Sequence, residues 1–192
     1  MSAGQARSSN PLRFSPPGFE DSTAPVIVRG GIRLIGEDGQ PLTLRDRRRL
    51  VVQGRVRIVV DAWDQVDGNE PRRRLGLYRL GYQVLDAKGV AIPGFEQPVE
   101  TIRFDRQPYE AAAARILYAS GSGIPEYGSR SSRFLYVVTA RLHDGIAVDG
   151  TFDTATLAPG NYTLRILAAD INGNATVRNR DLSITVAPRP QE

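Results

Sequence analysis

The stretch at residues 157–186, LAPGNYTLRILAADINGNATVRNRDLSITV, decides the fold. From Tyr162 the residues alternate, with Leu164 and Ile166 on one side of the chain, and this period of two predicts a strand with one face on a core. The polar cluster DINGN at 170–174 predicts a tight turn, because Asx side chains bind local backbone N–H groups and glycine accepts positive φ. Alternation resumes at 182–186, so the whole stretch predicts a hairpin.

Two motifs in this hairpin carry a resemblance. LAPGNY at 157–162 resembles the tyrosine corner of immunoglobulin-like and fibronectin type III sandwiches, in which a tyrosine hydroxyl binds upstream backbone. ADINGN at 169–174 resembles the end of the penultimate strand in bacterial immunoglobulin-like domains. The resemblance implies a fold and says little about function.

The remaining chain fits that architecture. VQGRVRIVVDAWD at 52–64 alternates and resembles the second strand of bacterial immunoglobulin-like modules. Further alternating segments lie at 75–85, 102–104 and 134–138, while an alanine-rich run at 109–118 predicts a short helix. We therefore expect an all-β protein: an immunoglobulin-like antiparallel β-sandwich with an extra N-terminal hairpin and one short helix.

Composition divides the chain into three parts. Residues 1–24 are rich in Ser and Pro and contain few large apolar residues, which predicts a disordered leader or linker. A turn signal at 37–41 between apolar runs predicts an N-terminal hairpin extension at 25–50, and the sandwich is expected at 51–188. No run approaches the roughly 18 apolar residues of a membrane span, and residues 1–10 lack the apolar core of a secretory signal.

Acidic residues follow two of the expected strands. Asp61, Asp64 and Asp67 lie in or after the second strand, and Asp170 and Asn172 follow the penultimate one. In an immunoglobulin-like sandwich those two loops emerge at the same end, so that their oxygen ligands could hold calcium. Alternatively, the same side chains form Asx turns and cap strand ends. No other cofactor is expected.

Trp63, Arg55 and Arg57 share the strand face opposite the expected core. Such a face could stack sugars or contact a neighbouring domain, or another segment of the same chain could cover Trp63. Nucleic acid is not an expected partner: a net charge of +4 is mild, and no interleaving of aromatic residues with the arginines resembles a stacking platform.

No catalytic arrangement is evident. The chain has no cysteine and a single histidine, His143. The neighbouring Asp144 could complete a Ser-His-Asp triad, but the sequence has no glycine-flanked serine of the nucleophile-elbow kind. We expect a turn histidine and no enzyme activity in this chain.

A wider resemblance leads to a functional expectation. LGLYRLGY at 75–82 and RFLYVV at 133–138 resemble the non-catalytic sandwich that follows lysostaphin-like (LytM-type) zinc peptidase domains in some envelope proteins. One histidine cannot supply that zinc site. The resemblance implies an accessory or interaction module of an extracytoplasmic (periplasmic or secreted) bacterial protein, with a neighbouring domain, an envelope protein or a polysaccharide as partner. The alternative is a stand-alone protein that binds carbohydrate or an envelope polymer.

Overall fold

The computed structural model describes residues 21–188 except 71, 107, 109, 111 and 125–132. One helix, α1 (Ala113–Leu117), and one 3-10 turn, η2 (Thr154–Thr156), interrupt an otherwise all-β chain in this part of the sequence. The strands are β1 (Val26–Ile35), β2 (Arg45–Asp46), β3 (Arg49–Val52), β4 (Arg55–Trp63), β5 (Arg79–Asp86), β6 (Val99–Arg103), β7 (Leu135–Val137), β8 (Arg141–His143), β9 (Ile146–Val148), β10 (Phe152–Asp153), β11 (Gly160–Ala169) and β12 (Asp181–Val186).

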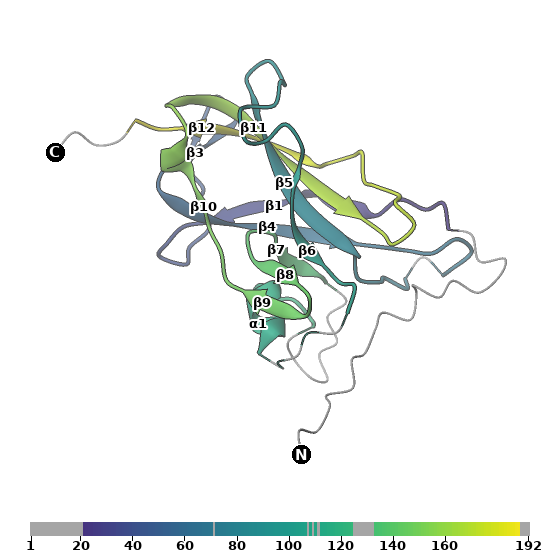
Figure 1. Ribbon diagram of the computed structural model, residues 1–192. Helices are drawn as coiled ribbons and strands as arrows, with labels where there is room; N and C mark the ends of the chain where they lie inside the picture. The colour runs from purple at the N-terminus through teal and green to yellow at the C-terminus, as the bar shows by residue number, and fades with distance from the viewer. Residues whose placement is uncertain are drawn as a thin grey trace.

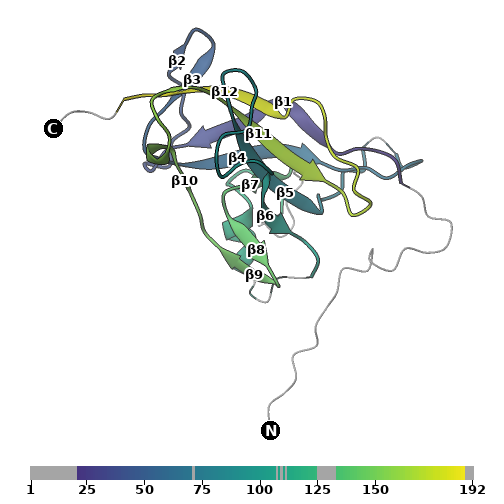
Figure 2. The ribbon, with the colours of Figure 1, turned by 45° about the horizontal axis from the view of Figure 1, so that its top comes forward.

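The strands form two sheets. The smaller has the order β1-β4-β10, with β7 also paired to β4; the larger has the order β2-β3-β12-β11-β5-β6-β8-β9. Figures 1 and 2 show β5, β11 and β12 lying over β1 and β4. β1, β4 and β10 lie in one sheet, whereas β5, β11 and β12 lie in the other. This division corresponds to strands A, B and E against C, F and G of an immunoglobulin-like sandwich. The predicted fold class is confirmed.

The core lies between the facing sheets and follows the period-two pattern. On β4, Val56, Ile58 and Val60 are buried, as are Leu164 and Ile166 on β11. Burial of each such side chain contributes about 1.5–3 kcal/mol relative to leaving it exposed. Both sheets therefore contribute buried apolar side chains to the core.

The segment at 25–50 contributes to both sheets. β1 pairs antiparallel with β4, and a bulge between Ile27 and Ile32 interrupts the pairing. The expected hairpin is short: Ile35 bridges to Pro41, and Leu42 donates its N–H to the Leu34 carbonyl at 2.8 Å. β3 then joins the other sheet as a parallel neighbour of β12. The chain before β4 thus supplies β1 to the smaller sheet and β2 and β3 to the larger one.

The helix lies where the alanine-rich run predicts it, although two residues of that run, Tyr109 and Ala111, lie outside the described residues. Ala113 and Leu117 face the core, and α1 packs beside β9 and β7. Among the described residues, no helix is long and apolar enough to cross a membrane. That finding agrees with the absence of a membrane span expected from the sequence.

Candidate functional site

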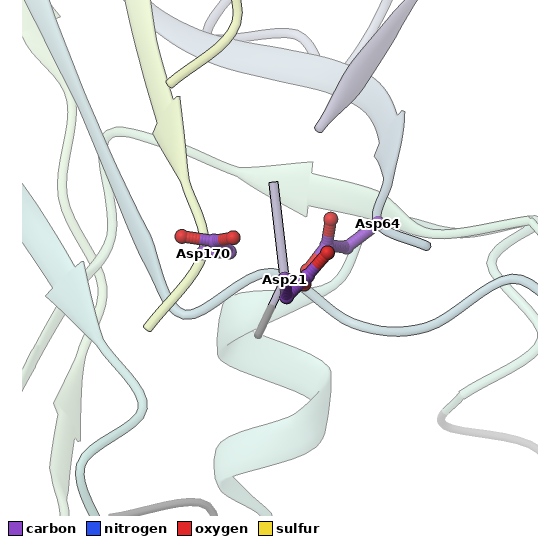
Figure 3. Close-up of side chains that lie close together, drawn as sticks. All are labelled: Asp21, Asp64 and Asp170. Atoms are coloured by element: carbon purple, nitrogen blue, oxygen red, sulfur yellow. The ribbon is translucent and has the colours of Figure 1, made fainter. Parts of the chain in front are cut away.

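Three carboxylates meet at one end of the sandwich. Asp64 directly follows β4, Asp170 directly follows β11, and Asp21 precedes β1. One carboxylate oxygen from each lies within 4.8 Å of those of the other two, and Figure 3 shows the side chains reaching one small space from three separate segments. We call Asp21, Asp64 and Asp170 the carboxylate cluster. Asp64 and Asp170 are buried, and Asp21 is half-buried.

The turn after β11 fixes Asp170. Its Oδ1 accepts the backbone N–H of Asn174 at 2.8 Å, and its Oδ2 accepts the Asn174 side-chain amide at 2.7 Å. The same amide donates to the backbone carbonyl of Asp21 at 2.7 Å. Asn174 therefore holds Asp170 and joins it to the segment that carries Asp21.

Asp64 is buried, and hydrogen bonds with neighbouring backbone groups fix its position. Its backbone exchanges hydrogen bonds of 2.9 and 2.8 Å with Leu75, and its Oδ1 accepts the N–H of Gln65 at 2.9 Å. Burial, and to a lesser degree the negative charges of Asp170 and Asp21, raises the pKa of Asp64 to about 7. The folded protein therefore favours the protonated form of the Asp64 carboxyl up to a pH of about 7.

Asp67 lies beside the cluster and binds the segment before β1. Its carboxylate accepts the backbone N–H of Ser22 at 3.0 Å, the Ser22 hydroxyl at 2.9 Å and the Thr23 hydroxyl. These hydrogen bonds, the one from Thr23 first, lower the pKa of Asp67 to about 2. Asp67 thus acts as an acceptor for residues 22 and 23, and through them it positions Asp21.

Of the other residues expected to bind calcium, Asn172 lies at the cluster, whereas Asp61 has another partner. Asn172 lines a cavity of about 240 Å³ together with all three carboxylates of the cluster. Asp61 is also buried, but its Oδ2 accepts the Arg133 guanidinium at 2.6 and 3.1 Å. The structure therefore brings together Asp64, Asp170 and Asn172, and it gives Asp61 and Asp67 other partners.

The sequence does not predict a role for Asp21, which falls in the expected leader at residues 1–24. Its signal is local and weak: the run Asp21-Ser22-Thr23 contains one acid among small hydroxyl residues. Only the contacts of this run with Asp67 and Asn174, more than forty residues away along the chain, place it at the site.

The donor set suits a hard cation. Calcium takes six to eight oxygen ligands, and carboxylates from separate loops are a usual source. Asp21, Asp64 and Asp170 would hold the ion, and Asn172 lines the same cavity. Repulsion among the carboxylates in the metal-free protein would be relieved by such an ion or by a proton on Asp64.

The second expected site lies elsewhere, on the outer face of β4. The Trp63 side chain is half-buried, and the Arg74 guanidinium lies 5.1 Å from its ring centroid. Arg55 forms an ion pair with Glu37, and Arg57 forms one with Asp149. All three residues therefore have partners within the chain.

His143 lies in the β8–β9 hairpin, where it is exposed. The adjacent Asp144 has φ of 53° and binds Arg106 at 3.0 Å rather than the imidazole. This geometry is that of a turn, in which Asp144 and Gly145 supply the two positive φ values of a tight hairpin.

This geometry defines an immunoglobulin-like sandwich with a carboxylate cluster at the end where β4 and β11 terminate. In comparisons with known proteins, no protein-family model, no curated protein and no solved structure matches this chain.

Proposed function

We propose that this chain is a non-catalytic accessory and interaction module of an extracytoplasmic bacterial protein, of the kind found beside cell-envelope peptidase domains. The charged groups singled out as candidate functional residues support a structural role: Arg133 binds Asp61, Asp149 binds Arg57, and Arg106 binds Asp144. Such pairs hold loops onto the sheets.

The observation that carries the proposal is the β9 edge of the larger sheet, which pairs with no further strand among the described residues. β9 is the last strand of that sheet, and its Ile146 and Val148 side chains are 60% and 53% exposed. An edge strand with exposed apolar side chains is a template for pairing with a strand of another protein. The interaction partner is therefore expected to add a strand beside β9.

Site-specific photo-crosslinking tests this surface. A photoreactive side chain at Ile146 is expected to capture a discrete envelope protein or an adjacent domain, because strand addition would place the partner within a few ångströms. The matched control is Val177, which is 73% exposed but lies outside the named strands. Equal capture at both positions, or none at Ile146, would remove the edge as the interaction surface.

The non-catalytic part of the proposal has its own test. Purified peptidoglycan incubated with the chain is expected to lose no turbidity and release no soluble fragments. Release that increases in proportion to the amount of protein would show that the chain itself is an enzyme.

The carboxylate cluster favours a second function, calcium-dependent stabilisation of the module. A site that binds only the folded form stabilises it by about 2.7 kcal/mol at a hundredfold excess of ligand over Kd. We expect millimolar calcium to raise the melting temperature relative to chelator, and Asp64→Asn and Asp170→Asn each to abolish the rise. Asp46→Asn, an exposed acid on β2, is the control that should keep it. Equal melting temperatures for the wild-type chain in calcium and in chelator would leave the cluster without a metal role.

Binding of carbohydrate or an envelope polymer through Trp63, Arg55 and Arg57 has less support, because Arg74, Glu37 and Asp149 already engage these side chains. Co-sedimentation with peptidoglycan is the corresponding measurement. Binding that Trp63→Ala abolishes would favour this function over strand addition at β9.

A further inference from the structure

A separate cavity of about 440 Å³ lies on the outer face of the smaller sheet. Its floor comes from strand pairing: Ile35 lies opposite Arg57, and Arg33 lies opposite Val59. Directly paired residues project from the same face of a sheet, so two apolar side chains and two guanidinium groups share this floor. The segment of α1 and the residues after it form one wall through Arg115, Ile116 and Ala119.

The charge of this cavity is unbalanced. Three arginines line it, and among the described residues its lining contains one carboxylate, Asp149, which is bound to Arg57. Arg33 and Arg115 are exposed, and neither forms an ion pair within the described part of the chain. The cavity therefore carries a formal excess of positive charge next to an apolar floor.

We propose that this cavity binds a small organic anion, whose carboxylate or phosphate group contacts Arg33 and Arg115 and whose apolar body lies on Ile35, Val59 and Ile116. The planar guanidinium group matches the two oxygens of such anions with paired, charge-assisted hydrogen bonds. A volume of about 440 Å³ lies within the range of small-molecule pockets. This inference goes beyond strand addition at β9 and does not depend on it.

The apolar floor decides between this ligand and a simple ion. Inorganic phosphate would satisfy the arginines but would leave the exposed parts of the half-buried Ile35 and Ile116 side chains in contact with water. An apolar body removes that surface from water, at about 25 cal/mol per Å² of apolar area buried. The ligand class is therefore an amphipathic anion.

Calorimetry and NMR titration with a small panel test the ligand class. The probes are 4-phenylbutyrate, octanoate and phenyl phosphate, compared with neutral 4-phenylbutyramide and with inorganic phosphate. We expect at least one organic anion to saturate a single site, with amide-resonance changes at Ile35, Ile116 and Ala119. The neutral amide and inorganic phosphate are each expected to bind about tenfold more weakly or worse, a loss of about 1.4 kcal/mol.

Substitutions assign the site. Arg33→Gln and Arg115→Gln are each expected to weaken binding of the organic anion about tenfold, the size expected for a lost charged hydrogen bond. Arg29→Gln is the matched control: Arg29 is an exposed arginine on the same strand as Arg33 and does not line the cavity. Its substitution removes the same charge and should change the affinity less than about twofold, since exposed charges at a distance are screened.

Four outcomes of the titrations would overturn the inference. They are no saturable binding of any organic anion in the panel, equal affinity for acid and amide, equal affinity for inorganic phosphate, and resonance changes confined to another face. An equal loss in Arg29→Gln and Arg33→Gln would likewise overturn it, because it would reduce the effect to net charge. Unchanged melting temperatures of the variants would establish that the affinity changes do not come from unfolding.

Discussion

At the scale of single residues, Tyr162 shows how a sequence motif becomes a contact. Its hydroxyl donates to the backbone carbonyl of Ala158 at 2.9 Å, four residues upstream. This is the tie that the LAPGNY motif predicts. Ala158 is exposed, so water can replace the hydroxyl as a donor to that carbonyl.

Tyr162→Phe is therefore expected to lower the free energy of unfolding by about 0.5–1.5 kcal/mol, the net value of an ordinary hydrogen bond. Urea denaturation measures it. Tyr78→Phe is the control, because the half-buried Tyr78 has no hydrogen bond from its hydroxyl within the described residues. A loss no larger than that of the control would contradict a stabilising corner.

Asp64 gives a pH dependence with a defined sign. Burial and the neighbouring carboxylates raise its pKa from 3.8 to about 7, so the folded state binds a proton that the unfolded state releases. The stabilising contribution is complete below the unfolded pKa and is lost as pH rises through about 7. In chelator, the melting temperature should fall between pH 5 and pH 8.

Asp64→Asn should flatten that slope, because the amide carries no titrating proton. Asp67 serves as a contrast: its pKa is lowered to about 2, so its contribution is lost only as pH falls through that value. Asp46→Asn, which removes an exposed carboxylate on β2 outside the cluster, should leave the slope between pH 5 and pH 8 unchanged. A wild-type melting temperature that rises with pH over this range would contradict the assignment to Asp64.

At the scale of secondary-structure elements, the approach of β5 and β6 depends on a glycine. The pairing shifts register between Leu80 and Gly81, and a Cβ at Gly81 would lie 2.2 Å from the Val99 carbonyl oxygen and 3.0 Å from the Glu100 Cα. Both atoms belong to the backbone. Neither can move aside without displacing β6.

Gly81→Ala is expected to destabilise the fold by about 1–3 kcal/mol or more, the usual cost of overpacking. Gly160→Ala is the matched control on β11, since its nearest neighbour would lie at 3.7 Å, an ordinary contact distance. Its effect should stay within about 0.5 kcal/mol. Equal stabilities of the two variants in urea denaturation would show that β6 adjusts freely.

Alternation along the chain was sufficient to predict β4, β5, β11 and β12, because each has one face in the core. Alternation could not predict that residues 25–50 contribute to both sheets. The pairing of β1 with β4 and of β3 with β12 depends on residues outside this segment, and β12 lies far away along the chain. The same limit applies to the site. Asp64 and Asp170 follow predicted strands and could be paired from the topology, whereas Asp21 joins them only through hydrogen bonds of the segment before β1.

At the scale of the whole molecule, the segment at 21–23 closes one end of the sandwich. It contacts Asp67 in the loop after β4 and Asn174 in the loop after β11, and so it joins the two sheets. A chain that begins at Pro25 should therefore melt at a lower temperature than one that begins at Glu20. The thermal transition followed by circular dichroism measures the difference, and superimposed transitions would show that residues 21–23 add no stability.

The antiparallel pairing of β11 with β12 also determines how the molecule responds to force. Val186 lies opposite Gly160, at the start of β11, whereas Asp21 lies beside Asp170, just past its end. Ten residues of extended chain separate these two points, roughly 30 Å. Tension applied through both ends of the described chain would thus run along the strands. It would load the hydrogen bonds between β12 and its neighbours in shear, all at once, instead of opening them one by one. Resistance to pulling is then governed by the rate of unfolding under load.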